Sequence, residues 1–423
     1  PPMPPPPLPR STPPAAIDAL HASQLSFFSS GATLPLAFRR AALLSLRSLV
    51  TSNEAAICAA LRKDLGKAPF EGAITETTVV VDEVDHALRH LAAWTAETAQ
   101  PSAGVLLPAS ASVLPSPRGV TLVIGPFNYP VSTLLGPLAS ALAAGDTAVL
   151  KPSELCPETS RLFAELVPRY FDEELVGVVE GEIPETTRLM EKEWGLVFFT
   201  GSERVAKIIG VSAAKTLSPM VLELGGKSPC IITKNHPELK AMCDRIAWGK
   251  TINAGQTCVA PDYLLVQEDV ADDVVAGLKS SLRSMFGDDV KKSVFSRNVS
   301  EMHTKRLVEM IGDAESLGGT VVCGGAATAD IPGRYFEPTI ILNPPKSSRV
   351  LTEEIFGCVL PVVTYKTDAD AAAYVRGMRG TPLAFYVFTR SDAAFRKFLD
   401  ACPSGGAVMN DVLVHFATIT IPF

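Results

Sequence analysis

The chain lacks the features that mark several familiar protein classes. Its eight cysteines form no CxxC pair and no His/Cys cluster with ligand spacing, which argues against zinc ribbons, other metal sites and disulfide frameworks. The net charge of −7, from 38 basic and 45 acidic residues, gives no electrostatic reason to bind nucleic acid or anionic membranes. No basic segment followed by an apolar one marks a secretory signal. We therefore predict a cytoplasmic protein without a resident metal.

The remaining composition is typical of a globular chain with more than one core. A length of 423 residues, 47% of them hydrophobic, indicates two or three domains and excludes a largely disordered chain. Residues 1–14 are dominated by proline and are expected to form a disordered tail. Residues 119–145 carry no charge and are long enough to cross a bilayer. Prolines interrupt this stretch, so a buried strand, a loop and a buried helix explain it better.

From residue 120 onward, short apolar strands alternate with helices. In the first series, the expected strands are Val120–Ile124, Thr147–Leu150, Leu175–Val179 and Gly195–Phe199, with a helix after each. A second alternating series begins at Ser228. This alternation predicts βαβ units and parallel sheets covered on both faces, hence two α/β domains with a junction near Gly225 and Gly226. Helices are expected before residue 95, and Ala99–Pro117 is expected to be a small extension or hairpin.

Three turns of the first series carry residues that could bind a ligand. No turn has the G-x-G-x-x-G spacing. Asn128, in the loop Gly125–Pro130, could donate its amide to a developing oxyanion or could satisfy its own turn. Lys151 and Glu154 follow the second strand and could hold sugar hydroxyls or form an ordinary surface pair. Gly201 and Ser202 open a helix, where they could approach a phosphate or simply cap the helix, so all three alternatives stay open.

Three later residues suggest acid–base and nucleophilic chemistry. Glu223 stands between two leucines, where desolvation would raise its pKa and suit a general base, although an exposed strand glutamate fits equally well. Cys258 ends the flexible segment Asn253–Cys258 and could be a thiolate nucleophile, although a cysteine is more often a small buried hydrophobe. Glu354 lies close to an aromatic residue, Phe356, and a glycine, where a helix-terminal charge pair is the alternative.

Taken together, these segments resemble the aldehyde dehydrogenase superfamily. GPFNYP, VLKPSE, FFTGS, LELGGKSP, NAGQTC and EEIFG occur in the order and spacing of that family. The residues of three segments are similar to those of the class 3 branch, which includes fatty-aldehyde dehydrogenases; the segments are LELGGKSPCI, NAGQTCVAPDY and PLAFYVFT. The resemblance extends from about residue 17 to residue 423.

The resemblance implies a role for each candidate residue. Cys258 would be the nucleophile and Glu223 the base, and Asn128 with the Cys258 backbone amide would form the oxyanion hole. The cofactor NAD or NADP would be held by six residues, which are Lys151, Glu154, Gly201, Ser202, Glu354 and Phe356. Thiolate attack on a medium- or long-chain aliphatic or aromatic aldehyde would give a thiohemiacetal, hydride loss would give a thioester, and water activated by Glu223 would release the acid.

The family fold implies a domain organisation. A Rossmann-like NAD(P)-binding domain would comprise residues 15–98 and 118–225, and the catalytic domain residues 226–411. Residues 99–117 and 412–423 would belong to a bridging element for oligomerisation. The family pattern continues beyond Phe423 with a segment that completes this element. A homodimer is expected when that segment is present, and the membrane anchor that it carries in some class 3 members is not visible here.

Two positions depart from the family pattern. Phe127 stands where tryptophan is common, and Ala206 where many members have glycine.

Two other functions are considered beside aldehyde oxidation to the acid. A CoA-acylating dehydrogenase is one alternative, which a water-activating Glu223 argues against. A truncated inactive or structural relative that binds nucleotide only is the other, and it is disfavoured because all catalytic side chains are present.

Overall fold

The computed structural model describes residues 11–421, which divide into two compact units. The described part of the N-terminal unit comprises residues 11–64 and 69–223, and that of the C-terminal unit residues 65–68 and 224–421. Of the predicted tail, residues 1–10 lie outside the described residues. Thr12 donates its backbone N–H to Glu180 O at 2.9 Å, and the first helix already begins at Pro14.

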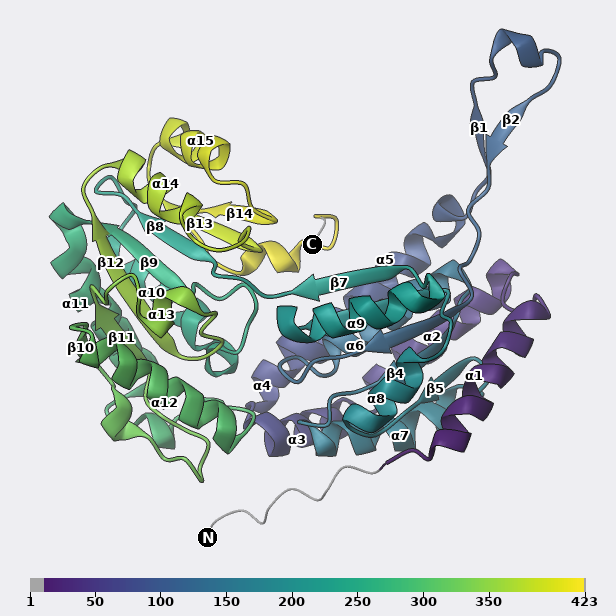
Figure 1. Cartoon of the computed structure of the whole chain (residues 1–423), viewed down its shortest axis with the longest axis horizontal. Helices are drawn as coiled ribbons and strands as arrows, with labels where there is room; N and C mark the ends of the chain where they lie inside the picture. Colours follow the sequence, from purple (N-terminus) through teal and green to yellow (C-terminus); the bar gives the residue numbers. More distant parts are fainter. Residues whose placement is uncertain (1–10, 422–423) are drawn as a thin grey trace. The chain divides into compact units, whose positions relative to one another are not determined.

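A five-stranded sheet forms the centre of the N-terminal unit (Figure 1). Its order is β5-β4-β3-β6-β7, with bounds β3 (Val120–Ile124), β4 (Thr147–Lys151), β5 (Val176–Val178), β6 (Leu196–Gly201) and β7 (Met220–Leu224). β3 runs parallel to β4 and β6, and β4 runs parallel to β5. Every residue of β3 and β4 is buried, as expected for strands covered on both faces.

Helices cover this sheet and account for the uncharged stretch. They are α1 (Pro14–Ser29), α2 (Leu36–Ser52), α3 (Glu54–Leu65), α4 (Pro69–Gly72), α5 (Thr78–Trp94), α6 (Ser132–Ala144), α7 (Pro157–Tyr170), α8 (Ile183–Met190) and α9 (Glu203–Thr216). Residues 119–145 form β3, a loop and α6, as predicted. None of the helices between residues 11 and 421 combines the length and apolarity that crossing a bilayer requires.

The expected extension is a two-stranded antiparallel hairpin. β1 (Thr98–Gln100) pairs with β2 (Ala111–Val113), and Thr98 lies opposite Val113. Figure 1 shows the hairpin extending away from the helices of its unit. Large apolar side chains near its tip are exposed, among them Val105 at 90% and Leu107 at 70%.

A seven-stranded sheet forms the centre of the C-terminal unit. Its order is β10-β11-β12-β9-β8-β13-β14, with bounds β8 (Pro229–Ile232), β9 (Tyr263–Gln267), β10 (Thr320–Cys323), β11 (Thr339–Leu342), β12 (Val359–Tyr365), β13 (Ala384–Phe388) and β14 (Gly406–Met409). The strands pair in parallel except β10, which runs antiparallel to β11. The structure thus confirms the predicted α/β class, with a parallel sheet in each unit.

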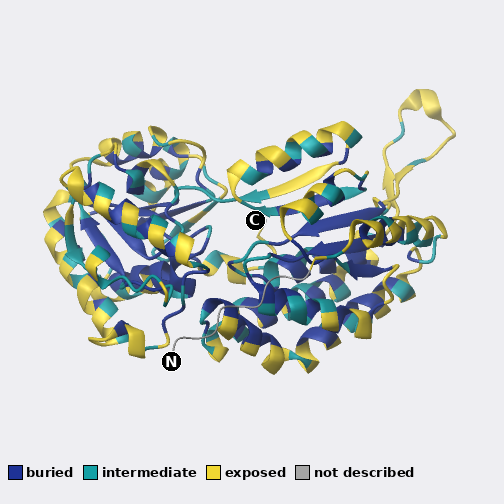
Figure 2. Cartoon of the chain, turned by 60° about the horizontal axis from the view of Figure 1, so that its bottom comes forward, coloured by how far each residue is buried: buried dark blue, intermediate teal, exposed yellow. Residues whose placement is uncertain are grey.

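Apolar side chains on both faces of this second sheet form the core of the unit. Its helices are α10 (Leu239–Thr251), α11 (Ala271–Phe286), α12 (Glu301–Ser316), α13 (Arg349–Thr352), α14 (Asp368–Arg376) and α15 (Asp392–Ala401). Ile231 on β8 pairs with Leu265 on β9 and with Val387 on β13, and all three are fully buried. The dark blue strands in Figure 2 show that burial of this kind extends over the central strands of both sheets.

Candidate active site

The candidate residues of the N-terminal unit follow the carboxyl ends of its strands. Asn128 follows β3, Lys151 ends β4, and Gly201 ends β6 with Ser202 directly after it. Because β3, β4 and β6 are parallel, these ends lie at one edge of the sheet, where ligands of α/β proteins usually bind. The sheet therefore gathers four sequence-predicted residues on a single edge.

The loop that carries Asn128 is fixed by hydrogen bonds along its length. Gly125 donates its N–H to Lys151 O at 3.0 Å, and the Cys156 thiol donates to Phe127 O at 3.2 Å. The Thr133 hydroxyl donates to Tyr129 O at 2.6 Å. Asn128 itself is only 4% exposed. A buried amide on a loop held in this way is pre-positioned as a donor.

Lys151 is a buried cation beside a more exposed carboxylate. Its side chain is 2% exposed, and its Nζ donates to Pro152 O at 2.8 Å and to Glu154 Oε2 at 3.4 Å. Burial lowers the pKa of Lys151, and the Glu154 charge opposes that shift. The pair presents one cationic donor and one anionic acceptor next to the end of β4.

Gly201 and Ser202 shape the turn into α9. A Cβ at Gly201 would come within 2.6 Å of the Phe199 ring, so glycine lets the backbone pass close to that ring. Ser202 caps α9, and its hydroxyl accepts the Val205 N–H at 3.4 Å. Ala206 packs its methyl group in the buried face of α9.

Glu223 lies on the edge strand β7. The first three residues of β7 are exposed, whereas Glu223 and Leu224 are half-buried. Burial raises the pKa of Glu223. A carboxylate in this environment is a stronger base than one in open water.

Cys258 follows a sharp break in the backbone after α10. Asn253 and Ala254 adopt left-handed conformations, with φ of 52° and 53°, and Gly255 follows at 77°. The buried Gln256 side chain holds this break, because its Nε2 donates to Asn253 O at 2.9 Å and to Arg297 O at 3.0 Å. Left-handed geometry at two non-glycine residues is costly and is characteristic of functional sites.

The Cys258 loop packs against the segment that carries Glu354 and Phe356. A Cβ at Gly255 would come within 2.5 Å of the Gly357 carbonyl group, so the two backbones touch and only glycine fits there. Phe356 also has a positive φ of 50°. The C-terminal unit therefore brings three predicted residues, Cys258, Glu354 and Phe356, into two adjoining strained loops.

Three long-range groups hold the segment around Glu354. Lys227 donates to Glu353 O at 2.8 Å and forms an ion pair with Asp262. Asp262 Oδ1 in turn accepts the Ile355 N–H at 3.0 Å. The Arg306 guanidinium, from α12, donates to Glu354 O at 3.3 Å and also to Ile355 O. None of the three was predicted as a site residue, although Lys227 lies inside LELGGKSP.

The Glu354 carboxylate is shielded from water. Gly226 donates its N–H to Glu354 Oε1 at 3.0 Å, and a Cβ at Gly225 would overlap the carboxylate. Burial and the nearby Asp262 charge raise the pKa of Glu354 to about 7, against the Gly226 bond and the charges of Lys227 and Arg306. The group is therefore poised to change its charge near neutral pH.

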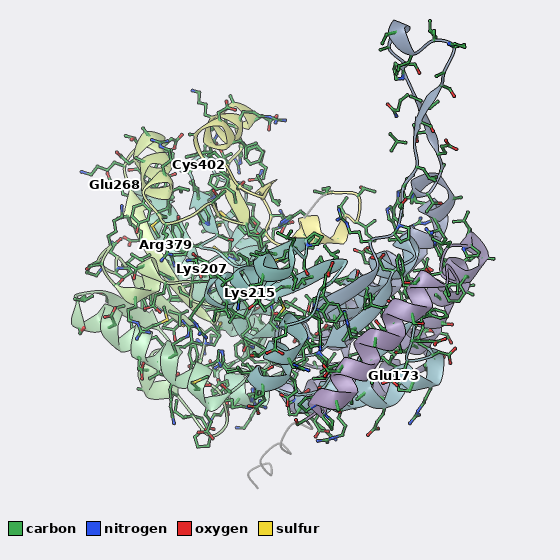
Figure 3. All side chains as sticks on the ribbon, turned by 45° about the vertical axis from the view of Figure 1, so that its right-hand side comes forward. Glu173, Lys207, Lys215, Glu268, Arg379 and Cys402 are labelled. Atoms are coloured by element: carbon green, nitrogen blue, oxygen red, sulfur yellow. The ribbon has the colours of Figure 1, made fainter. Side chains whose placement is uncertain are left out.

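The other cysteines differ from Cys258 in their surroundings. None of the eight forms a disulfide, and only Cys258 and Cys323 are not buried. Cys402, labelled in Figure 3, lies at the end of α15, and its thiol donates to Ala372 O at 3.8 Å. Burial raises the pKa of the Cys323 thiol. Among residues 11–421, no group of three or more His, Cys, Asp or Glu side chains is arranged to hold a metal ion.

Comparison with known proteins places these loops in a family. Residues 8–423 match the aldehyde dehydrogenase family model. The chain is 38% identical over 397 residues to a mouse "Aldehyde dehydrogenase, dimeric NADP-preferring", covering 94% of this chain and 86% of the relative. It is 39% identical over 400 residues to mouse "Aldehyde dehydrogenase family 3 member A2", covering 94% and 80%.

A solved structure agrees with the sequence comparison. The Staphylococcus aureus AldH in a substrate-bound state superposes with a TM-score of 0.92 at 36% identity, covering 96% of this chain and 88% of that one. Fold, sequence and the order of the site motifs point the same way, and the chain belongs to the aldehyde dehydrogenase family.

Proposed function

We propose that this aldehyde dehydrogenase oxidises aldehydes to carboxylic acids with Cys258 as nucleophile, Asn128 as oxyanion donor and Glu223 as base. The observation that carries the proposal is the Cys258 loop, which two left-handed residues and the buried Gln256 hold in one conformation. A thiol held in this way loses little freedom when it attacks a carbonyl. The comparisons do not favour an inactive or purely structural relative.

The residues divide the reaction into two stages. The Cys258 thiolate adds to the aldehyde carbon, and the Asn128 amide and the Cys258 N–H stabilise the resulting oxyanion in the thiohemiacetal. Loss of hydride leaves a thioester on Cys258. Glu223 then takes a proton from water, which attacks the thioester and releases the acid. A base at this position favours hydrolysis over transfer of the acyl group to CoA.

The side chains at the edge of the first sheet fit a dinucleotide. Bound NAD or NADP supplies the hydride acceptor. Lys151 and Glu154 offer a donor and an acceptor for ribose hydroxyls, and Gly201 with Ser202 at the start of α9 offers backbone amides for the pyrophosphate. We assign Glu354 and Phe356 to the nicotinamide end, because their loop adjoins the Cys258 loop.

The decisive experiment replaces the nucleophile. Cys258→Ala should lose NAD(P)H production by at least about 10³-fold, because the covalent stage is removed. The variant should still bind cofactor, which titration of the protein fluorescence would measure. Cys402→Ala is the matched control, since Cys402 packs in the core and should keep kcat within about twofold. Substantial turnover by Cys258→Ala would refute the nucleophile assignment.

Substrate and cofactor choice follow from the relatives and the residues together. We propose medium- or long-chain aliphatic or aromatic aldehydes as substrates. Glu154 would disfavour a 2′-phosphate, whereas the mouse relative is named NADP-preferring. Steady-state rates with hexanal, a long-chain aldehyde and benzaldehyde, each with NAD and NADP, would settle both choices, and product analysis with added CoA would test hydrolysis.

We further propose a cytoplasmic homodimer. The mouse relative is named dimeric, and the exposed apolar side chains at the hairpin tip and on β7 could be covered by a second copy. The cysteines are scattered and form no disulfide, which supports a reducing compartment.

A further inference from the structure

Helix α6 starts without a cap of its own. Its N-cap residue, Val131, has no side chain that could accept the first amides of the helix. The Glu76 carboxylate takes that place, and its Oε2 accepts the Val131 N–H at 3.0 Å and the Ser132 N–H at 2.9 Å. A residue far earlier in the chain therefore completes the turn that follows Asn128.

Glu76 comes from an unusual turn. Residues Ala73–Thr77 form a π-helical turn between α4 and α5, and such turns often occur at functional sites. Glu76 and Thr77 are both fully buried, and the Thr77 hydroxyl donates to Glu54 Oε2 at 2.9 Å. Burying a carboxylate is costly unless it is compensated, and the amides and dipole of a helix N-terminus provide that compensation.

The same carboxylate changes what the first βα turn can bind. In dinucleotide-binding folds of the common type, this turn carries glycines and its helix N-terminus binds the pyrophosphate. Here Glu76 already occupies the amides at the start of α6, and its negative charge would repel a phosphate. The turn is therefore free to hold Asn128, which accounts for the missing glycine pattern.

We propose that Glu76 is a positioning residue that fixes the Asn128 amide for the oxyanion by anchoring Val131 and Ser132. This inference rests on the proposed role of Asn128. Hydrogen bonds to Phe127 O and Tyr129 O restrain the loop on either side of Asn128, and Glu76 fixes the point where the loop enters α6. A shift of about 1 Å in such a group is enough to reduce a rate about 10²-fold.

A double-mutant cycle tests the proposal in the full chain. Asn128→Ala should lower kcat/KM for the aldehyde by about 10²–10³-fold at saturating NAD. Glu76→Ala should lower it by up to about 10²-fold. In the double variant, Glu76→Ala should add less than about threefold to the Asn128→Ala loss, because residues that act as a unit are not additive. The dissociation constant for NAD should stay unchanged in all three variants.

Two further variants separate positioning from stability and from charge. Glu76→Gln should recover kcat/KM to within about fivefold of the parent chain, since an amide oxygen can accept the same two N–H groups. Asp82→Ala, an exposed acidic site on the neighbouring helix α5, is the control and should have no effect. If Glu76→Ala does not fold, Glu76→Asp replaces it in the cycle, because its shorter side chain withdraws the carboxylate from the amides.

The outcomes are distinct. Additive losses in the cycle, a Glu76→Gln variant as impaired as the alanine variant, or weakened NAD binding would each overturn the positioning role while leaving the proposed function intact. An Asn128→Ala variant with unchanged kcat/KM would instead refute the oxyanion assignment, and the inference would fall with it.

Discussion

Two carboxyl groups of the proposed site, Glu223 and Glu354, lie where water has limited access. Burial is the first cause of the raised pKa in both, and for Glu354 the Asp262 charge adds to it. A raised pKa has opposite consequences for function and stability. It makes each group a better proton acceptor, but ionising it in the folded chain is unfavourable.

The pH dependence of acid release should report Glu223. In its proposed role as base, Glu223 must be ionised. Its pKa lies above the ordinary 4.5, so kcat should fall as the pH is lowered through that raised value. A profile of kcat between about pH 5 and pH 9, measured where thioester hydrolysis is rate-limiting, would show this fall as an acidic limb. Glu223→Gln should lose the limb together with most of the hydrolysis, whereas Glu203→Gln, an exposed site on α9, should keep both. Persistence of the limb in Glu223→Gln would assign it elsewhere.

The stability of the chain should report Glu354. The pKa of Glu354 is raised from 4.5 to about 7 in the folded chain, so folding favours its protonated form. The stability that this carboxyl group contributes is complete below the unfolded-state pKa near 4.5 and is lost as the pH rises through about 7. Glu354→Gln should therefore stabilise the chain at about pH 8 by roughly 1–3 kcal/mol and have little effect at about pH 5. Thermal unfolding at both pH values measures the difference. Glu353→Gln at the exposed neighbouring position should change stability by less than about 0.5 kcal/mol, and equal effects at both pH values would contradict the linkage.

At the scale of helices and strands, the segment around Glu354 depends on partners from distant elements. Lys227 lies between β7 and β8, Asp262 directly before β9, and Arg306 on α12. Between them they engage the backbone of Glu353, Glu354 and Ile355. The loop therefore owes its conformation to tertiary hydrogen bonds rather than to its own sequence.

Removal of Arg306 should loosen that loop. Burial lowers the pKa of this guanidinium, and its donors serve two carbonyl oxygens. Arg306→Leu should raise KM for NAD by about tenfold with a smaller effect on kcat, because binding is lost more than chemistry. Initial-rate kinetics with varied NAD would measure it. Lys305→Ala, an exposed neighbour on α12, should match the parent chain, and an unchanged KM in Arg306→Leu would show that the loop does not need this support.

Most elements could be predicted because each strand of a βαβ unit is a short apolar run between polar turns. Helices α14 and α15 and the strand β14 were not predicted. β14 contains Gly406 and is not buried, so no apolar run marks it. Helix α14 is rich in alanine and aspartate, and its periodicity is weak.

The motif residues of the candidate site could be named from the sequence, but the residues that support them could not. Glu76 and Arg306 act on residues far away in the chain, Ser132 and Ile355 among them, and nothing in their neighbours signals this. Likewise, the left-handed backbone at Asn253 and Ala254 is imposed by packing against other segments. Only the folded chain reveals such contacts.

At the scale of the whole molecule, the N-terminal unit exposes more apolar surface than isolated side chains explain. Val105, Leu106 and Leu107 at the hairpin tip and Ile208 and Val211 on α9 are all exposed. A run of exposed apolar side chains, such as the three at the hairpin tip, usually marks an interface. In the proposed dimer, a second copy of the chain would cover these side chains.

Charge placed at the hairpin tip should weaken that dimer. Leu107→Glu would require a carboxylate to be buried on association, so we expect the dimer dissociation constant to rise by at least about tenfold. Sedimentation velocity over a range of concentrations would measure it. Val294→Glu, at a site in the C-terminal unit with 70% exposure, is the matched control and should leave the dissociation constant unchanged. A dimer unaffected by Leu107→Glu would place the interface elsewhere.

The assignment of residues 65–68 to the C-terminal unit affects how the protein can be expressed as two fragments. These residues are flanked by the N-terminal unit on both sides but belong to the C-terminal one, where Leu65 O accepts the Arg297 N–H at 2.7 Å. During synthesis, residues 65–68 leave the ribosome long before Arg297, so this hydrogen bond can form only after the later segment has been made. A gene divided after Glu223 would place Leu65 and Arg297 on different fragments. Either fragment expressed alone would lack one partner of this hydrogen bond, and a split-protein reporter would restore it only when both fragments associate.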